Sequence, residues 1–254
     1  MIHSWFQIFI RHLKKNPLYP IINTLGLTLG ITCFILVTLF VSHETSYEKW
    51  NPNLENIYRP IRLFDNGEVW NTAPYIMVTK AQEELPEIED ALILGWDGSL
   101  LFNNEGKKLV KGMRRTTSNF FDFYPYPLKY GNKEQLFVNE NDLVLSDEFA
   151  FELFGDSNPV GQVVHTTYQN KAKSFTITGV YITKDYPSDV QPPILRLIKK
   201  QSEFTEGQLQ WGNFNYDALF KMHPNTDIAA FIKKFDEFYD TNTAKSWSTP
   251  LEEY

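Results

Sequence analysis

The sequence predicts an α+β protein in which one N-terminal transmembrane helix precedes a mixed domain of one or two subdomains. Residues 18–41 contain no Asp, Glu, Lys, Arg or His. Downstream, segments in which apolar residues alternate with a period of two are interspersed with segments of helical period. They do not follow the regular strand–helix–strand order of a parallel sheet, so we expect α+β rather than α/β.

Composition limits the function classes. The chain has 254 residues, of which 43% are hydrophobic and 22% charged, and this balance is typical of a folded protein. The net charge is −7, and the long C-terminal part has no basic cluster, so we expect no nucleic-acid partner. Cys33 is the single cysteine, which rules out an intramolecular disulfide.

The apolar run is long enough to span a membrane. At 1.5 Å per residue, residues 18–41 would extend roughly 36 Å, against about 30 Å of hydrocarbon. A buried core helix of a soluble protein is disfavoured by this uninterrupted length. A cleaved signal peptide would have an apolar region of about 7–15 residues and a small-residue cleavage site. Residues 42–47 (SHETSY) do not provide such a site.

Charge predicts the orientation. Arg11, Lys14 and Lys15 precede the helix, whereas residues 44–49 carry two Glu and one Lys. The excess of basic residues on the cytoplasmic side of membrane helices places the N-terminus inside the cell. We therefore expect a cytoplasmic amphipathic segment (residues 1–16), a transmembrane helix (17–43) and an external domain (44–254).

Two features of the N-terminal part suggest further membrane contacts. Apolar residues recur at helical spacing within residues 2–13, which predicts a short amphipathic helix on the inner membrane surface. Asn16-Pro17 would separate it from the membrane helix. Gly26 and Gly30 lie one turn apart, and such pairs allow two membrane helices to approach closely.

The first half of the external part contains two strands, a helix and a turn before a third strand. The expected elements are a strand at 56–64, a helix at 73–85 ended by Pro86, a strand at 87–95 closed by a turn at Asp97-Gly98, and a strand at 108–117.

The second half begins with a strand at 141–145 that leads into a helix at 146–154. Ser146 is the expected N-cap and Gly155 the expected stop of this helix. Residues 174–182 alternate as a strand, with Phe175, Ile177 and Tyr181 on one face. A proline-containing loop is expected at 183–193.

A strand at 214–222 and a helix at 227–239 complete the prediction. Asn225 or Thr226 would cap this helix. Its expected buried stripe consists of Ile228, Phe231, Ile232, Phe235 and Phe238.

No residue pattern predicts catalysis. The five histidines show no metal-ligand spacing, and neither a phosphate-binding loop nor a nucleophile elbow occurs. The acidic residues within 83–90 fit a solvated helix end. Arg114-Arg115 fits a solvated strand face, with partner contact as the alternative, and the aromatic cluster at 211–216 fits core more than a binding surface. We therefore expect no catalytic, cofactor-binding or metal-binding residues, and no cofactor.

Four stretches, in order along the chain, resemble the FtsX-like permeases of ABC transporters that carry a MacB-like periplasmic core domain. The first joins residues 16–19 (NPLY) to 22–31 (INTLGLTLGI), and the second joins 43–50 (HETSYEKW) to 56–59 (NIYR). The third runs through 143–150 (LVLSDEFA), 153–156 (LFGD) and 158–161 (NPVG), and the fourth is 175–180 (FTITGV). Each match is loose, but together they nearly cover the chain.

The resemblance implies a non-catalytic permease component in the bacterial inner (cell) membrane, with a cytoplasmic N-terminus and a periplasmic domain. Its implied partners are a cytoplasmic ABC ATPase subunit, other permease helices or a second copy at the Gly26–Gly30 face, and a periplasmic substrate or partner. ATP-driven motion would pass through the membrane to the periplasmic domain, for export or mechanotransmission.

Two departures accompany the resemblance. The loop at 187–193 (PSDVQPP) differs from the family pattern, and the sequence ends before a second apolar run, where the family continues through further helices. We therefore expect the N-terminal piece of a permease. A freestanding membrane-anchored periplasmic binding or assembly module is the alternative, and an anchored enzyme is a weaker third.

Overall fold

The computed structural model describes residues 11, 15, 17–64, 66–104, 107–168, 171–198 and 204–247. Its contacts divide the chain into two units, Met1–Tyr47 and Glu48–Tyr254. The second unit is called the sheet domain here. The predicted α+β class is confirmed, since the described residues combine one long apolar helix with a sheet and several shorter helices.

The first unit contains α2 (Leu18–Glu44), which has 27 residues. Pro17 occupies its N-cap with a φ of −69°, a position where the missing N–H of proline has no helical partner to lose. None of its residues is buried, and by length and composition α2 could cross a membrane. Apart from Arg11, the amphipathic helix predicted at 2–13 lies outside the described residues.

The sheet domain is built on one large sheet with the strand order β1-β12-β5-β6-β11-β8-β10-β7, in which β4 also pairs with β12 and β9 pairs with β10 and β5. These strands are β1 (Ile57–Tyr58), β4 (Thr72–Ala73), β5 (Ile88–Asn104), β6 (Lys107–Thr116), β7 (Leu128–Gly131), β8 (Asp142–Ser146), β9 (Val163–Tyr168), β10 (Lys171–Tyr181), β11 (Ile194–Leu197) and β12 (Tyr216–Met222).

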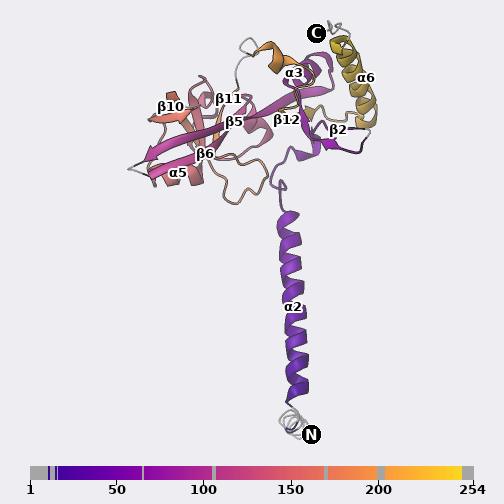
Figure 1. Ribbon diagram of the computed structural model, residues 1–254, viewed down its shortest axis with the longest axis vertical. Helices are drawn as coiled ribbons and strands as arrows, with labels where there is room; N and C mark the ends of the chain where they lie inside the picture. Colours follow the sequence, from indigo (N-terminus) through magenta and orange to yellow (C-terminus); the bar gives the residue numbers. More distant parts are fainter. Residues whose placement is uncertain are drawn as a thin grey trace, which may run out of the picture. The chain divides into compact units, whose positions relative to one another are not determined.

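A small hairpin and four α-helices accompany the sheet. They are β2 (Arg62–Leu63) with β3 (Val69–Trp70), α3 (Tyr75–Glu84), α4 (Phe120–Phe123), α5 (Asp147–Phe154) and α6 (Ile228–Trp247); 3₁₀ turns lie at Leu54–Asn56, Lys133–Gln135 and Glu206–Leu209. Figure 1 shows β5 running from the region of α3, β12 and α6 to the region of α5, β6 and β10.

Part of the sheet closes on itself. Strand β5 pairs with β6, and the order continues through β11, β8, β10 and β9. Strand β9 then returns to β5, where Leu101 lies opposite Thr167 and Phe102 opposite Thr166. These six strands therefore form a closed ring, which we call the barrel.

One hydrophobic cluster fills the barrel. Every strand of the ring contributes a side chain to it, and α5 adds Phe149, Ala150 and Leu153. A second cluster packs α3 and α6 against β12 and the start of β5. A third gathers the aromatic residues of α4 against the opposite face of β5. Strand β5 contributes to all three clusters.

Several predicted elements are confirmed with close boundaries, namely α3, β6, β8, α5, the loop at 183–193 and β12. The cap of α5 is as expected, since Ser146 Oγ accepts a hydrogen bond from Phe149 N at 3.2 Å. Gly155 ends the helix with a φ of +61°, a conformation that glycine adopts without strain.

The single strand predicted at 56–64 is wrong. Pro60 lies between two short strands, β1 and β2, which belong to different sheets. Proline has no N–H to donate to a ladder, so continuous pairing across this position is disfavoured.

The turn predicted at Asp97-Gly98 is also wrong, because β5 continues to Asn104. Three steps from Trp96 to Ser99 on β5 match two steps from Arg114 to Gly112 on β6. The extra residue is a β-bulge, and Gly98 accommodates it with a φ of +76°. The Asp97-Gly98 pair predicts a turn from its sequence, but in the structure it forms a bulge. Both structures use a residue with a positive φ, so this sequence pair fits either one.

The predicted common face of Phe175, Ile177 and Tyr181 on β10 is wrong for Tyr181, because the strand contains a register shift. Phe175 and Ile177 do share the barrel cluster, but Val180 joins them there while Tyr181 lies in the aromatic cluster of α4. The shift occurs between Ile177 and Gly179 in the pairing with β8, so the alternation inverts past that point.

The predicted start and stripe of α6 need two corrections. Asp227, rather than Asn225 or Thr226, caps the helix, because its Oδ1 accepts a hydrogen bond from Ala230 N at 3.1 Å. Ile232 is 54% exposed and is not part of the buried stripe, whereas Phe231 and Phe238 are buried. The helix extends to Trp247, beyond the predicted end.

Gly131 should tolerate no side chain. Its φ is +102°, and an added Cβ would lie 2.7 Å from the backbone oxygen of Thr178. Gly161 has a similar φ of +87° but open space around the same position, so it isolates the backbone effect. We expect Gly161→Ala to destabilise by about 1–2 kcal/mol from backbone strain alone.

Gly131→Ala should destabilise clearly more, because the clash with backbone adds to the strain. Urea unfolding of both variants, followed by circular dichroism, measures the difference. Equal losses of unfolding free energy would contradict the close packing of β7 against β10.

Candidate functional site

The sheet domain begins at Glu48, and its first residues are hydrogen-bonded to other parts of the same domain. Only residues 45–47 separate the helix from Glu48. Glu48 N donates to Pro187 O at 2.9 Å, and Trp50 Nε1 donates to the same oxygen at 3.0 Å. The Trp50 ring centroid lies 4.6 Å from that of Tyr126 and 5.2 Å from that of Tyr186. One indole thus joins the segment to the proline-containing loop.

A second attachment reaches the α4 region. Asn51 is buried, and its Nδ2 donates to Phe123 O at 2.8 Å. Asn53 Nδ2 donates to Asp122 O at 3.1 Å. Residues 48–53, which we call the junction segment, are therefore held by side-chain hydrogen bonds at two separate places in the sheet domain.

Glu48 places a half-buried carboxyl in this segment. Its Oε1 accepts hydrogen bonds from Ser188 Oγ and from Asp189 N, while Oε2 is buried with no hydrogen-bond partner among the described residues. Burial raises the pKa of Glu48 above its usual 4.5, and the Ser188 hydrogen bond partly opposes this. The backbone of Glu48 is left-handed, with a φ of +59°.

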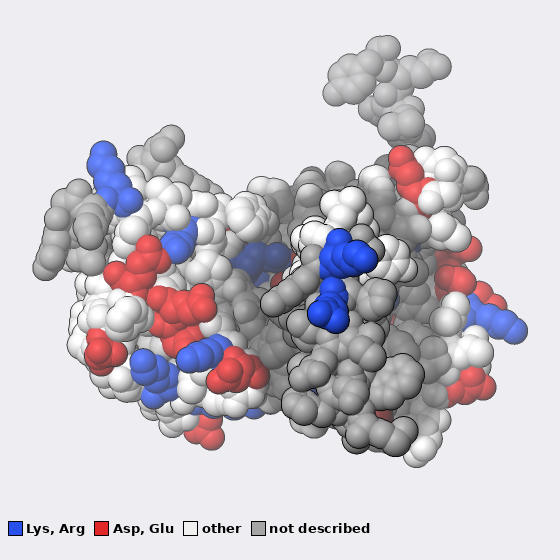
Figure 2. Space-filling model, turned by 90° about the horizontal axis from the view of Figure 1, so that it is seen from below, with Lys and Arg blue, Asp and Glu red and all other residues white. Residues whose placement is uncertain are grey.

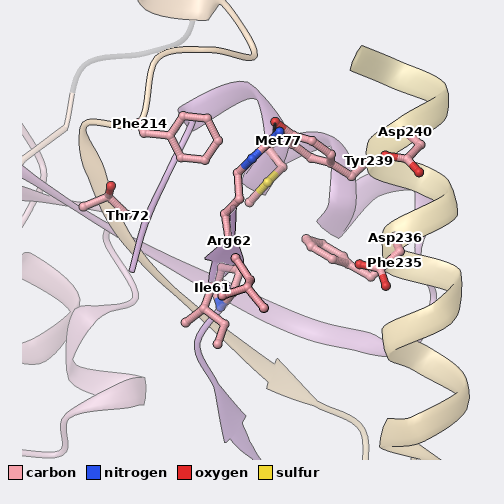
Figure 3. Close-up of a pocket in the computed structure, with 11 residues that line it drawn as sticks. Ile61, Arg62, Thr72, Met77, Phe214, Phe235, Asp236, Tyr239 and Asp240 are labelled. Atoms are coloured by element: carbon pink, nitrogen blue, oxygen red, sulfur yellow. Dashed lines mark hydrogen bonds between the residues drawn. The ribbon is translucent and has the colours of Figure 1, made fainter. Parts of the chain in front are cut away.

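An aromatic-lined cavity of about 390 Å³ lies beside α6. Figure 3 shows Arg62 directed toward Tyr239, with Phe214 nearby. The guanidinium carbon of Arg62 lies 4.9 Å from the Phe64 ring centroid, 5.7 Å from that of Phe214 and 4.8 Å from that of Tyr239. Its Nη1 also donates a hydrogen bond to Tyr239 Oη. The arginine is held in place by rings rather than by a carboxylate.

The hairpin that carries Arg62 has an exposed apolar surface. Ile61 is 64% exposed, Leu63 71% and Val69 57%. Trp70 packs on Phe214 with ring centroids 5.5 Å apart. Clustered exposed apolar side chains are typical of contact surfaces.

Helix α2 has an open face at its glycine pair. An added Cβ at either Gly26 or Gly30 would meet no atom within 4 Å. The two residues lie four positions apart, on one side of the helix. A neighbouring helix could approach closely there.

The acidic residues at 83–90 form ordinary surface pairs. Lys234 Nζ lies 2.7 Å from Glu87 Oε1, and Lys221 pairs with Glu89. Figure 2 shows acidic and basic side chains interspersed on the face in view. No group of three or more His, Cys, Asp or Glu side chains within the described residues has the geometry of a metal site.

Two sequence interpretations need correction. Arg114 and Arg115 do not form a solvated strand face, because Arg114 pairs with Asp217 and Arg115 with the buried Asp97. The aromatic cluster at 211–216 divides: Tyr216 belongs to the core, whereas Phe214 lines the Arg62 cavity. Spacing in sequence did not reveal Asp97, because its position depends on the bulge.

The chain is similar to known proteins in sequence and in fold. The sequence model of the MacB-like periplasmic core domain matches residues 21–237, a range that includes most of α2. None of the curated proteins matches the sequence.

Among solved structures, a permease-protein domain from Porphyromonas gingivalis superposes with a TM-score of 0.62 at 18% identity, over 75% of this chain and 85% of that one. The periplasmic region of MacB from Actinobacillus actinomycetemcomitans gives 0.50 at 13% identity, over 73% and 81%. The extracellular domain of the ABC-type transporter YknZ gives 0.47 at 11% identity, over 68% and 85%. At these identities the likeness concerns the fold.

The raised pKa of Glu48 predicts a pH dependence of stability. In the unfolded chain this carboxyl titrates near 4.5, whereas in the folded protein it retains its proton to higher pH. The folded state therefore binds more protons in the window just above 4.5, and the free energy of unfolding falls as pH rises through it.

We expect Glu48→Gln to remove this fall, measured as the melting temperature of the detergent-solubilised chain against pH. Glu68→Gln, at an exposed position in the β2–β3 connection, is the control and should keep the wild-type profile. Identical pH profiles for wild type and Glu48→Gln would contradict the burial of this carboxyl.

Proposed function

Since this chain belongs to the family of MacB-like periplasmic core domains, we propose that it is a non-catalytic permease portion of an ABC transporter. In this proposal α2 anchors the chain in the bacterial inner membrane and the sheet domain lies in the periplasm. A partner ATPase supplies the motion, and the sheet domain delivers it to a substrate or protein outside.

The junction segment is the observation that carries this proposal. Three residues span at most about 10 Å, so the connection between α2 and Glu48 is short. Beyond it, Glu48, Trp50, Asn51 and Asn53 are all hydrogen-bonded to the sheet domain. A connection of three residues limits how far the two units can separate, whereas a long flexible linker would not, and this short connection supports the proposed transfer of motion.

The other partners follow from the membrane helix. The Gly26–Gly30 face would receive another permease helix or a second copy of the chain. The basic residues at 11–15 support a cytoplasmic N-terminus, the side on which the proposed ATPase would act.

The second candidate is a freestanding membrane-anchored binding or assembly module. The exposed apolar hairpin and the Arg62 cavity favour it, because such a surface can bind a partner without any ATPase. Dependence on an ATPase partner separates the two candidates.

Topology can be tested with single cysteines. In a Cys33→Ala background, Lys129→Cys places an exposed thiol on β7 and Lys15→Cys places one before α2. We expect a membrane-impermeant maleimide to label Lys129→Cys in intact spheroplasts, and Lys15→Cys only after lysis. Labelling with the opposite order would overturn the proposed orientation.

Partnership can be tested by affinity purification of the full chain from detergent-solubilised native membranes. We expect an ABC-type ATPase to co-purify, identified by peptide mass spectrometry. The double variant Gly26→Ile/Gly30→Ile should reduce its yield at least about tenfold, because the bulkier side chains prevent close helix packing.

The matched control is Thr28→Ile, which adds bulk on the opposite side of α2 and should leave the yield unchanged. A chain that inserts in the membrane but brings no ATPase would favour the freestanding module instead.

A further inference from the structure

One end of the barrel, which we call the barrel mouth, holds two arginines against a single carboxylate, and these side chains are largely buried. Arg115 Nε lies 3.1 Å from Asp97 Oδ1, and Arg196 Nη1 lies 3.1 Å from Asp97 Oδ2. Tyr168 Oη donates a hydrogen bond to Asp97 Oδ1 at 2.8 Å. Asp97 is 5% exposed and Arg196 only 2%. Two guanidinium groups therefore share one carboxylate out of contact with most of the solvent.

The three charged side chains of this cluster come from three strands, β5, β6 and β11. The bulge at Asp97-Gly98 on β5 turns the carboxylate toward β6 and β11. Arg196 of β11 lies directly opposite Arg115 of β6 in their parallel pairing. The guanidinium carbon of Arg196 also lies 5.6 Å from the Tyr168 ring centroid and 5.9 Å from that of Phe175.

The arginines are incompletely satisfied. Nε and Nη1 of Arg196, and Nε of Arg115, are buried without a well-aligned hydrogen bond to any described residue, despite their proximity to Asp97. A buried cation is costly unless it is paired and hydrogen-bonded. One carboxylate cannot neutralise two guanidinium groups, so the cluster retains a positive charge.

A cavity of about 840 Å³ opens onto this cluster, and Asp97, Arg115, Tyr168 and Arg196 all contribute to its wall. The exposed ring of Trp96 forms another part of the wall. Among the described residues of the wall, Arg115, Arg196, Lys171 and Lys173 are basic, whereas Asp97 and Glu140 are acidic. Basic side chains therefore outnumber acidic ones in the described part of the wall, and Arg115 and Arg196 share the single carboxylate of Asp97.

We propose that the barrel mouth is a binding site for a small dianionic ligand, a phosphate monoester or a dicarboxylate. Guanidinium groups bind both classes through paired N–H···O contacts, and barrel mouths are common ligand sites. A dianion could pair with both guanidinium groups, Arg115 and Arg196, and the exposed ring of Trp96 offers an apolar contact to the body of the ligand. This site does not depend on the proposed transport function.

The test uses the full chain in detergent, with isothermal titration of inorganic phosphate and of succinate at pH 7.5 and constant ionic strength. Both probes are mainly dianionic at this pH. We expect saturable one-to-one binding of at least one of them, and the stronger probe identifies the ligand class. Acetate, a monoanion, should bind at least about tenfold more weakly, since it carries half the charge of either probe and cannot pair fully with both guanidinium groups.

Variants locate the site. Lys171→Gln, at an exposed position, should weaken the stronger probe about three- to tenfold without affecting folding, and Arg196→Lys should weaken it more, because lysine lacks the planar donor pair. Arg114→Gln is the matched control, since Arg114 pairs with Asp217 and does not line this cavity. Its affinity should equal that of wild type.

Two results would overturn the proposal. One is no detectable binding of phosphate or succinate at about 10 mM by a chain whose circular dichroism spectrum shows it to be folded. The other is binding that Lys171→Gln, Arg196→Lys and Arg114→Gln leave equally unchanged, because the ligand would then occupy another place.

Discussion

Strand β5 is the constraint on which the sheet domain depends. It has 17 residues, about three times the usual strand length, and it pairs with β12, β6 and β9 in turn. Its first part places side chains in the clusters of α3–α6 and of α4, and its last part places them inside the barrel. The bulge between these parts inverts the alternation, so Leu92 and Leu94 face one cluster while Leu100 and Phe102 face another. A regular strand of the same length would send Leu100 to the wrong face.

The same bulge determines which charged side chains meet at the barrel mouth. It is the reason that Asp97 lies against Arg115 and Arg196, and the charges there are arranged by backbone geometry rather than by flexible surface side chains. In the junction segment, likewise, three side chains hold residues 48–53 to the proline-containing loop and to α4. In both places, a small number of side chains form bonds to partners that are distant in sequence.

Local sequence patterns predicted most of the helices and strands, because interactions between residues close in sequence determine where these elements begin and end. The Ser146 cap, the Gly155 stop and the alternation of β12 depend on neighbours within a few residues. The failures concern long-range pairing. The bulge at Asp97, the register shift of β10 and the pairing of Arg115 are set by partner strands that lie far away in sequence. For the same reason neither the Asp97–Arg115–Arg196 cluster nor the Arg62 cavity could be recognised from spacing, whereas the long apolar helix could.

The closed barrel limits the number of strand edges that the sheet domain leaves open. Because β9 pairs with β5, the ring leaves fewer N–H and C=O groups without a strand partner than an open sheet of the same strands would. Within the described part of the sheet, its ordered path ends at β1, with two residues, and at β7, with four. An added strand would find only a few backbone groups at either of these two ends. The topology thereby disfavours edge-to-edge association of sheets through β1 and β7.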